Sequence, residues 1–366
     1  MRTFSLSLFF VFLLFVVSCT PAEKPQETVK IGFSSALTGP FAATSQWALN
    51  GIDLALERLP TEERARIQLI IENDESKPAT GMTIAQKFAE IENIKYIVGP
   101  LNGQVIVPTA AYYDEHKMLR MHPGLGLEST ITTGTYKFFL LGELKPLMQA
   151  LATYGSTHSI STVSILYLNN EYGLDNLNWF EKYYTQAGGK ILAKEAFELG
   201  ENDVRTQLTK IKATKPDAVF LITAGPALVS ALKQMDELGI TTKKLSLINT
   251  EDTEVVKSAG RLIEGVLYPT IIDTTQSDIK TWFGQRYQEK FSVPHEAVAA
   301  SAFDSFNILW AAIKKCGDDT DCAKAEIGKT RNYVGASGAF SVDERGVGIR
   351  TPAIKTVKDG KFVYIE

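Results

Sequence analysis

The stretch "VKIGFSSALTGPFAATSQWALNGIDLALERLPTEERARIQLIIEND", residues 29–74, decides the fold class of this chain. Its first eight and its last eight residues are short runs that favour β-strands. Between them, apolar residues recur at the spacing of one helix face: Leu49, Ile52, Leu56 and Leu59. A strand, a helix and a second strand in this order predict a βαβ unit with parallel strands.

The same alternation continues along the chain in two runs, which are separated by a break near residue 141. Further strands are predicted at 95–101, 118–121 and 162–170. Two long helices, 277–291 and 295–315, then lead into a strand-and-turn region with the Asp-Gly hairpin signal "KDGK". We therefore predict an α/β fold with two Rossmann-like lobes, each built on a largely parallel sheet.

The N-terminus has the pattern of an export signal. Arg2 precedes an apolar run, Phe4–Val17, which is shorter than the about 20 residues that a bilayer span requires. The run ends in "VVSC", which resembles the bacterial lipoprotein cleavage box, where Cys19 is acylated and becomes the mature N-terminus. An ordinary signal peptide with an incidental cysteine is the alternative. We predict a signal peptide at residues 1–18 and a polar, lipidated tether at 19–28.

The composition excludes one class of partner. Hydrophobic residues make up 45% and charged residues 22%, as in ordinary globular proteins. The net charge of −4 and the lack of any run of five Lys or Arg argue against a nucleic-acid partner.

Two further cysteines, Cys316 and Cys322, lie close together in "CGDDTDC". In an exported protein an isolated close pair favours a disulfide. A metal site is disfavoured because no His or second Cys pair lies nearby, and the aspartates between them lack the spacing of a calcium loop.

Several motifs follow one another in a specific order. They are "IGFSSALTGPFA", "NGIDLAL", "YIVGPLNG", "ILYLNNEYG" and "ASAFDSFNILWAAIKKCG". In this order they resemble the type I periplasmic solute-binding proteins of the leucine/isoleucine/valine-binding family, the extracytoplasmic receptors of ABC importers. The resemblance covers nearly everything after the tether.

The resemblance implies the periplasmic binding protein type I fold, in which two lobes are joined by three crossovers and close on a hinge over a ligand. We place the crossovers near Leu141, Ile271 and Phe340. Lobe 1 then comprises residues 29–141 and 273–339, and lobe 2 comprises residues 142–271 and 340–366.

The resemblance also implies partners and a location. The partners are a small-molecule solute, the permease subunits of an ABC transporter and, through the lipid anchor, the membrane. The location is the cell envelope, on the extracytoplasmic side. A ligand-sensing protein of the same fold that acts in signalling is the alternative.

Ligands of open parallel sheets bind beyond the carboxyl ends of the strands. This rule and the resemblance predict the following ligand-binding residues: Asn102, Gly103, Gly124, Leu125, Gly126, Tyr172, Gly225 and Glu251. Tyr172, in "NEYG", matches the aromatic residue of the family's second lobe. Backbone N–H groups at a helix start favour an anion, so we expect a ligand carboxylate near Gly103.

The chain departs from the family's amino-acid binders at this site. Those proteins usually carry hydroxyl side chains where this chain has Gly103 and residues 124–126. An aromatic residue expected near Ala224 or Gly225 is missing, and Glu251 or Asp252 only approximates the acid that pairs with an ammonium group. Because a buried charge without partners costs several kcal/mol, we expect an amino-acid-like solute, an amide or a carboxylate rather than a zwitterionic amino acid. Alternatively, Gly124 and Gly126 only form a turn.

Enzyme motifs are incomplete in this sequence. The run Gly124-x-Gly126 continues with Ser129 where the dinucleotide fingerprint needs Gly or Ala. None of the four histidines pairs with another at metal-ligand spacing, and no nucleophile elbow is present. His122, beside the expected cleft, could donate to a ligand carboxylate, although a structural role is favoured. We predict that the chain is not an enzyme and that it has no cofactor and no metal.

Overall fold

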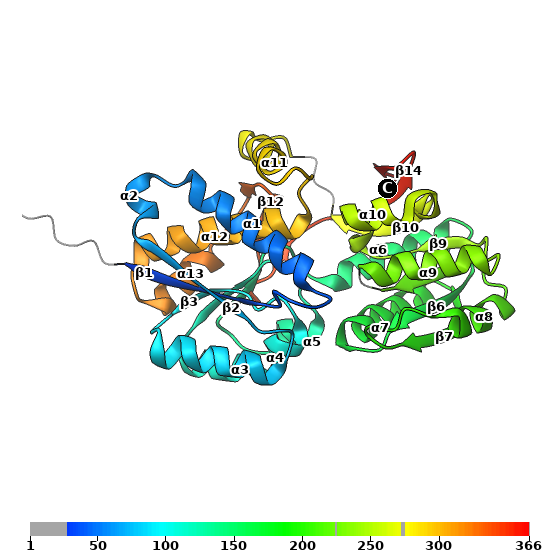
Figure 1. Cartoon of the computed structure of the whole chain (residues 1–366), viewed down its shortest axis with the longest axis horizontal. Coiled ribbons are helices and arrows are strands. Elements are labelled where there is room, and N and C mark those ends of the chain that lie inside the picture. Colours follow the sequence, from blue (N-terminus) through cyan, green and yellow to red (C-terminus); the bar gives the residue numbers. More distant parts are fainter. Residues whose placement is uncertain (1–27, 224, 272–274, 366) are drawn as a thin grey trace, which may run out of the picture.

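The computed structural model describes residues 28–223, 225–271 and 275–365. The predicted signal peptide and Cys19 lie outside the described residues. Two lobes lie side by side along the long axis of the molecule (Figure 1). The first lobe contains the N-terminal strands and the long helices α11 and α12, and the second contains the middle of the chain.

The first lobe is built on a parallel sheet with the strand order β2-β1-β3-β4-β5. Its strands are β1 Val29–Ser35, β2 Ile67–Asn73, β3 Tyr96–Val98, β4 Leu119–His122 and β5 Lys137–Phe139. One face packs against α1 Ala42–Arg58, α11 Asp278–Phe291, α12 Ala297–Cys316 and α13 Thr320–Gly328. The other face packs against α3 Pro78–Gln86 and α4 Gly103–Glu115.

The second lobe is built on a sheet with the order β15-β14-β10-β9-β8-β6-β7. The five parallel strands are β6 Thr162–Leu168, β7 Lys190–Phe197, β8 Ala218–Ile222, β9 Lys243–Leu245 and β10 Val266–Ile271. The antiparallel strands β14 Pro352–Lys358 and β15 Lys361–Tyr364 complete one edge. Helices cover both faces: α6 Leu144–Thr157, α7 Glu171–Gln186, α8 Arg205–Ala213, α9 Pro226–Glu237 and α10 Thr253–Ala259.

Both sheets agree with the predicted α/β fold. Strand β8 illustrates the sequence signal from which it was predicted. All five residues of "AVFLI" are buried between helices on the two faces of the sheet. A parallel strand that is covered on both sides carries a continuous apolar run instead of an alternating one.

A small antiparallel sheet belongs to the first lobe. It consists of β11 Tyr333–Gly335, β12 Gly338–Val342 and β13 Gly348–Ile349. Phe340 and Val342 lie in the core of the first lobe, and the Phe139 amide donates to the Gly346 carbonyl at 2.9 Å. The chain therefore enters the second lobe between Ile349 and Pro352, later than the expected crossover near Phe340. Strand periodicity shows that a strand forms but not which lobe it joins.

The other two passages between the lobes also follow from the elements that flank them. Strand β5 ends at Phe139 in the first lobe, and Leu144 at the start of α6 is buried in the core of the second. Strand β10 ends at Ile271 in the second lobe, and α11, which begins at Asp278, contributes Phe283 to the core of the first.

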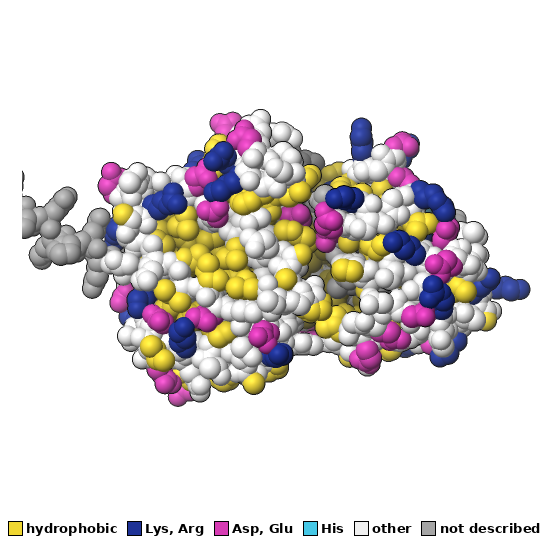
Figure 2. Space-filling model, viewed as in Figure 1, with side chains coloured by type: hydrophobic (Ala, Val, Ile, Leu, Met, Phe, Trp, Pro, Cys, Tyr) yellow, Lys and Arg dark blue, Asp and Glu magenta, His cyan; other side chains and the backbone are white. Residues whose placement is uncertain are grey.

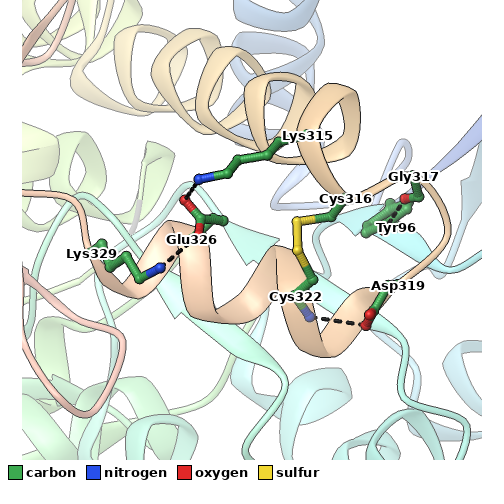
Figure 3. Close-up of a disulfide and its surroundings, with 8 residues drawn as sticks. All are labelled: Tyr96, Lys315, Cys316, Gly317, Asp319, Cys322, Glu326 and Lys329. Atoms are coloured by element: carbon green, nitrogen blue, oxygen red, sulfur yellow. Dashed lines mark hydrogen bonds and ion pairs between the residues drawn. A yellow bond between two sulfur atoms is a disulfide. The ribbon is translucent and has the colours of Figure 1, made fainter.

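A disulfide joins Cys316 and Cys322 at the end of α12, with their Cα atoms 5.7 Å apart (Figure 3). Next to it, the Gly317 carbonyl accepts a hydrogen bond of 2.6 Å from the phenol of Tyr96. Because Tyr96 begins β3, this contact places the C-terminal end of α12 beside the N-terminal ends of the strands. The N-terminal end of α12 therefore lies toward the C-terminal ends of the strands.

Helices α1 and α12 pack at a very short separation in the first core. Gly51 of α1 faces the α12 backbone, and a β-carbon added to it would lie 2.1 Å from the Ala299 carbonyl oxygen. Backbone cannot yield as a flexible side chain can, so the packing of these two helices requires glycine at this position.

We expect Gly51→Ala to lower the free energy of unfolding by about 1–3 kcal/mol, because the added methyl group forces α1 and α12 apart. Urea unfolding followed by circular dichroism measures the change. The matched control is Gly328→Ala in α13, where an added β-carbon has nothing within 4 Å. The control should shift stability by less than about 1 kcal/mol. Equal effects of the two substitutions would contradict this account of the packing.

Candidate ligand-binding cleft

The two lobes meet through loops at the carboxyl ends of their strands. Ser129, in the short helix α5 Glu128–Thr132 that follows β4, donates a hydrogen bond to Glu171 at the start of α7. The neighbouring Glu128 amide donates to Asp175 at 3.2 Å, and Leu127 is buried in the second lobe's core. Figure 2 shows a groove between the lobes with hydrophobic side chains on its walls.

The loop that follows β4 contains three of the predicted ligand-binding residues, and the structure separates their roles. A β-carbon at Gly124 would have only Leu101 within 4 Å, at 3.9 Å, so space remains beside this residue. Leu125 is half-buried and packs against the second lobe's core. Gly124 and Leu125 therefore lie where the lobes meet.

Gly126 has a structural reason to be glycine. A β-carbon there would lie 2.6 Å from the side chain of Ile131. Its amide donates to the Gly142 carbonyl at 2.9 Å, and its carbonyl accepts from the Leu144 amide at 3.0 Å. Both backbone groups are thus already paired beside the first passage between the lobes, so we do not include Gly126 in the proposed site.

Asn102 and Gly103 form the start of α4. The Asn102 side chain accepts from the Gln104 amide at 3.1 Å and donates to the Ser76 hydroxyl at 3.1 Å. Asn102 is therefore a helix cap, and its amide group is occupied within the chain.

The position beside Gly103, where we expected a ligand carboxylate, is occupied by a carboxylate of the protein. A β-carbon at Gly103 would lie 2.5 Å from Oε2 of Glu171, which belongs to the second lobe. The other oxygen of Glu171 accepts the hydrogen bond from Ser129. Gly103 thus leaves room for an acidic side chain from the opposite lobe.

In the second lobe, Tyr172 lies directly after Glu171 and packs against the core beneath the cleft. Burial raises the pKa of its phenol, so the hydroxyl group stays protonated. Gly225 caps the start of α9 with a φ of 45°, and a β-carbon there would meet nothing within 4 Å. Ala224, where a second aromatic residue was sought, lies outside the described residues.

Glu251 is paired within its own lobe. Its carboxylate forms an ion pair of 2.7 Å with Lys355 of β14 and accepts a hydrogen bond of 3.1 Å from Tyr268. A ligand ammonium group would have to compete with Lys355, so we do not carry Glu251 into the proposed site.

Asp252 follows Glu251 and caps α10, where it accepts a hydrogen bond of 2.9 Å from the Glu254 amide. Burial raises the pKa of Asp252.

His122 is buried and neutral. One ring nitrogen, Nδ1, lies 2.6 Å from the Pro100 carbonyl, which can only accept, so Nδ1 carries the proton. The ring stacks on Phe139 at 4.5 Å between ring centroids. Burial, and next the charge of Arg120, lower the pKa of His122 to about 3. His122 therefore cannot donate a proton from Nε2 to a ligand carboxylate, as considered from the sequence.

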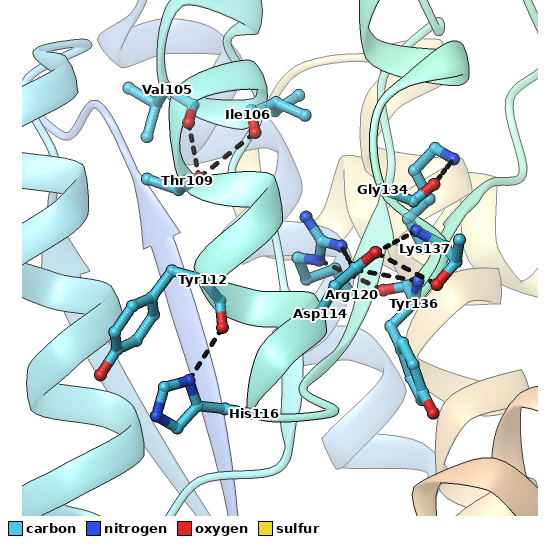
Figure 4. A network of polar contacts seen from close by, with 11 residues as sticks. Val105, Ile106, Thr109, Tyr112, Asp114, His116, Arg120, Gly134, Tyr136 and Lys137 are labelled. Atoms are coloured by element: carbon cyan, nitrogen blue, oxygen red, sulfur yellow. Dashed lines mark hydrogen bonds and ion pairs between the residues drawn. The ribbon is translucent and has the colours of Figure 1, made fainter.

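Arg120, whose charge lowers the pKa of His122, belongs to a buried ion pair on β4. Arg120 is fully buried and contacts Asp114 at 2.5 Å, and Asp114 also accepts from the Tyr136 amide at 3.2 Å (Figure 4). Lys137 donates to the Gly134 carbonyl, and burial lowers the pKa of Lys137 to about 8. This network joins α4 to β4 and β5.

The predicted ligand-binding residues did not include several polar residues at the strand ends. The hydroxyl groups of Thr223, after β8, and Thr250, after β9, are fully buried and have no hydrogen-bond partner among the described residues. Asn249 donates to the Thr223 carbonyl at 3.0 Å, which leaves its own carbonyl oxygen unpaired within that part of the chain. Their positions after predicted strands were the only available signal.

Glu296 was also not identified from the sequence. It occupies the N-cap position of α12, at the end of the first lobe where the strands end, without a capping hydrogen bond from its side chain. Its carboxylate accepts a hydrogen bond of 3.3 Å from Tyr287. Burial raises the pKa of Glu296 to about 7, and the negative charge of Asp252 in the opposite lobe adds to the rise.

A cavity of about 170 Å³ lies at the passages between the lobes. Its lining residues are Leu141, Gly142, Glu143, Pro146, Leu147, Ile271, Asp343, Arg345, Val347, Gly348, Ile349, Arg350 and Pro352. Arg345, in the turn between β12 and β13, pairs with Glu143 of the second lobe at 2.9 Å. None of the predicted ligand-binding residues lines this cavity, so we assign it to the hinge.

Within residues 28–223, 225–271 and 275–365, no group of three or more His, Cys, Asp and Glu side chains could hold a metal ion. In the same part of the chain, no helix has both the length and the apolar character needed to cross a membrane.

Comparisons with known proteins give consistent matches. A family model described as periplasmic binding protein matches residues 28–361. The Leu/Ile/Val-binding protein homolog 1 of Brucella suis biovar 1 is 23% identical over 352 residues, which cover 92% of this chain and 93% of that protein.

Solved structures are similar over the same range. The leucine-binding protein LivK of Thermotoga maritima has a TM-score of 0.85 at 23% identity and covers 93% of this chain and 98% of its own. A solute-binding protein of an ABC transporter from R. palustris, in complex with benzoate, has a TM-score of 0.83 at 15% identity and covers 92% and 95%. At these identities the likeness concerns the fold.

We expect Glu296→Gln to weaken the pH dependence of stability. The folded-state pKa of about 7 lies above the ordinary 4.5, so the carboxyl group costs stability as the pH rises from 4.5 through 7. Apart from burial, the hydrogen bond from Tyr287 lowers this pKa and the charge of Asp252 raises it. At pH 8 the variant should be about 1–2 kcal/mol more stable than the wild type, less than the full pKa difference implies because the side chain is partly exposed.

Urea unfolding at pH 4.5, 6 and 8 measures this effect. Glu254→Gln, an exposed acid on α10, is the control and should follow the wild-type profile. If the wild type and Glu296→Gln have parallel pH profiles, the pKa of Glu296 is not raised in the folded protein.

Proposed function

The chain belongs to the periplasmic binding protein family, and we propose that it is an extracytoplasmic receptor that traps a small organic solute between its lobes and delivers it to an ABC permease. The family is one of binding proteins, in agreement with the prediction that the chain is not an enzyme. The observation that carries the proposal is the arrangement of two parallel sheets whose strand-end loops meet across a groove.

The geometry supports a hinge mechanism. The three passages between the lobes lie together at one cavity, and the ion pair between Arg345 and Glu143 connects the first lobe to the start of α6 there. Rotation about these passages separates or joins the loops after β4 and β6 without disturbing either core. Closure on a solute then removes its apolar surface from water.

We propose that Gly124, Leu125, Tyr172 and Gly225 line the solute site. Gly124 and Gly225 have free space beside them, and Leu125 and Tyr172 supply apolar surface from the two lobes. Similar proteins are named for leucine, isoleucine and valine or are bound to benzoate, so a small solute with an apolar part agrees with them.

We also propose that the receptor is held at the membrane by lipid on Cys19, followed by the tether at residues 19–28. The support is the sequence alone: a positive start, an apolar run and the box "VVSC". A tether of this composition allows the folded lobes to reach a permease in the same membrane.

A solute that binds should both stabilise the protein and close it. At a concentration of one hundred times its dissociation constant, a solute adds about 2.7 kcal/mol of stability. A thermal-shift screen of amino acids, amides, carboxylates, purines, amines and aromatic compounds detects it, and small-angle scattering should show a smaller radius of gyration. Tyr172→Ala should weaken binding by at least about tenfold, while Tyr112→Ala on α4 should not. A rigid particle that responds to no solute would rule out the proposal.

We expect Cys19→Ser to move the protein from the membrane fraction to the soluble extracytoplasmic fraction, because acylation needs the cysteine sulfur. Cell fractionation and incorporation of labelled palmitate measure this. The double variant Cys316→Ser/Cys322→Ser is the control and should remain with the membrane. Release of the control, or retention of Cys19→Ser with unchanged labelling, would show that Cys19 is not the anchor.

A further inference from the structure

One carboxylate of the second lobe is in direct contact with the first lobe. Glu171, the first residue of α7, accepts a hydrogen bond from the Ser129 hydroxyl through one of its oxygens. Its other oxygen lies against Gly103, where an added β-carbon would be 2.5 Å from it. A methyl group of Leu127 borders the same position, at 3.2 Å from that β-carbon. A buried glycine, an apolar side chain and a hydroxyl donor of the first lobe therefore surround the end of the Glu171 side chain.

The packing of α7 fixes the position of Glu171 in the second lobe. Gly173 lies so close to the end of β6 that an added β-carbon would be 1.8 Å from the Leu168 carbonyl oxygen. The Asn170 side chain caps α7 and accepts a hydrogen bond of 2.9 Å from the Gly173 amide. The start of this helix is thus held on both sides of Glu171.

The Glu171 carboxylate adjoins the proposed solute site. Tyr172, which we place in that site, is the next residue of the chain. On the first lobe, a β-carbon at Gly124 would lie 3.9 Å from Leu101, which is two residues before Gly103. The carboxylate therefore lies beside the walls that the two lobes present to a solute.

The negative charge at this place has no neighbouring cation in the described chain. Within residues 28–223, 225–271 and 275–365, neither Glu171 nor Asp175, one turn later on α7, forms an ion pair with Lys or Arg. Asp175 accepts a hydrogen bond of 3.2 Å from the Glu128 amide, so both acids of this turn face α5. A solute carboxylate beside them would meet like charge, which disfavours binding.

The space beside Gly103 is suited to one carboxylate and has no room for a second. The Ser129 hydroxyl donates to the group that lies there, and the first turn of a helix such as α4 also favours a negative charge. Glu171 leaves too little room at Gly103 for even a single β-carbon. A carboxylate of the solute could enter only if Glu171 were displaced.

We propose that Glu171 is a specificity-determining residue of the receptor, because its carboxylate takes the place of a carboxylate on the solute. The receptor then selects small solutes that lack this group, such as amides and alcohols with an apolar part. This inference rests on the proposed function and narrows its solute class. The internal carboxylate joins the lobes at Gly103 and Ser129, and the solute fills the space beside Leu125 and Tyr172.

Glu171→Ala tests the assignment without knowledge of the natural solute. The atoms that this substitution removes correspond to acetate, and their loss leaves the Ser129 hydroxyl without this acceptor. Sodium acetate at pH 7.5, compared with sodium chloride at equal ionic strength, should raise the Tm of the variant saturably by about 2 °C or more. The wild type should show no such rise, because its own carboxylate fills the position.

Two further variants locate the effect of acetate. Glu181→Ala removes the same atoms from the same helix, but there the carboxylate pairs with Lys194 within the second lobe. Acetate should not stabilise this control. In Glu171→Ala/Ser129→Ala the acetate concentration for half of the effect should rise by at least about fivefold, because the donor is lost. Circular dichroism checks that each variant folds.

Selectivity gives a readout that a purely structural contact between the lobes would not change. Isothermal titration calorimetry at pH 7.5 compares 3-methylbutanamide with 3-methylbutanoate, and benzamide with benzoate. In at least one pair the wild type should bind the amide at least about tenfold more tightly than the carboxylate. Glu171→Ala should bind the carboxylate of that pair at least about tenfold more tightly than the wild type does. If neither member of either pair binds, the acetate experiment decides.

The outcomes separate this inference from the proposed function. Acetate that fails to stabilise Glu171→Ala, or that stabilises the wild type or Glu181→Ala equally, overturns the assignment. Tighter binding of a carboxylate than of its amide by the wild type also overturns it. In these cases closure on any solute, seen by scattering, keeps the receptor function. If no solute of the wider screen binds or closes the wild type, the receptor function fails, whatever acetate does to the variant.

Discussion

Burial of both faces of each parallel sheet is the constraint on which the rest of the structure depends. Because helices cover the two faces, a ligand binds at the end of each sheet where the strands end. Three passages of the chain hold the two lobes so that their strand-end loops meet, with Ser129 against Glu171 and Glu128 against Asp175. A ligand is therefore recognised by short loops and by the starts of helices. The distance between the strand-end loops of the two lobes depends on the hinge.

Much of the fold could be predicted because its signals are local. The helical spacing in α1, the apolar run of β8 and the turn Asp359-Gly360, where both residues have positive φ, each depend on a few neighbouring residues. The passage at residues 349–352 could not be located in this way. Phe340 alternates with small neighbours, Ala339 and Ser341, as a strand residue can in either lobe, and only tertiary contacts assign it to the first lobe's core.

The candidate site was less predictable because its chemistry depends on pairings between distant segments. Position after a strand identified Asn102, Gly126 and Glu251, but each has its polar groups occupied by partners elsewhere in the chain, such as Lys355 for Glu251. Glu171 was not among the predicted ligand-binding residues, because its position beside Gly103 depends on the approach of the two lobes. Asp252 was considered only as an approximate partner for an ammonium group, and Glu296 was not identified.

The two-lobed arrangement also determines how a solute can drive closure. A ligand shifts the balance between open and closed forms only by as much as it binds one form better. A solute that packs on Leu125 of the first lobe and on Tyr172 of the second contacts both lobes only in the closed form. A solute held by one lobe alone binds the open and the closed form equally well and does not favour either. Closure therefore depends on a solute that reaches both lobes at once, because only such a solute loses additional apolar surface to the protein when the lobes approach.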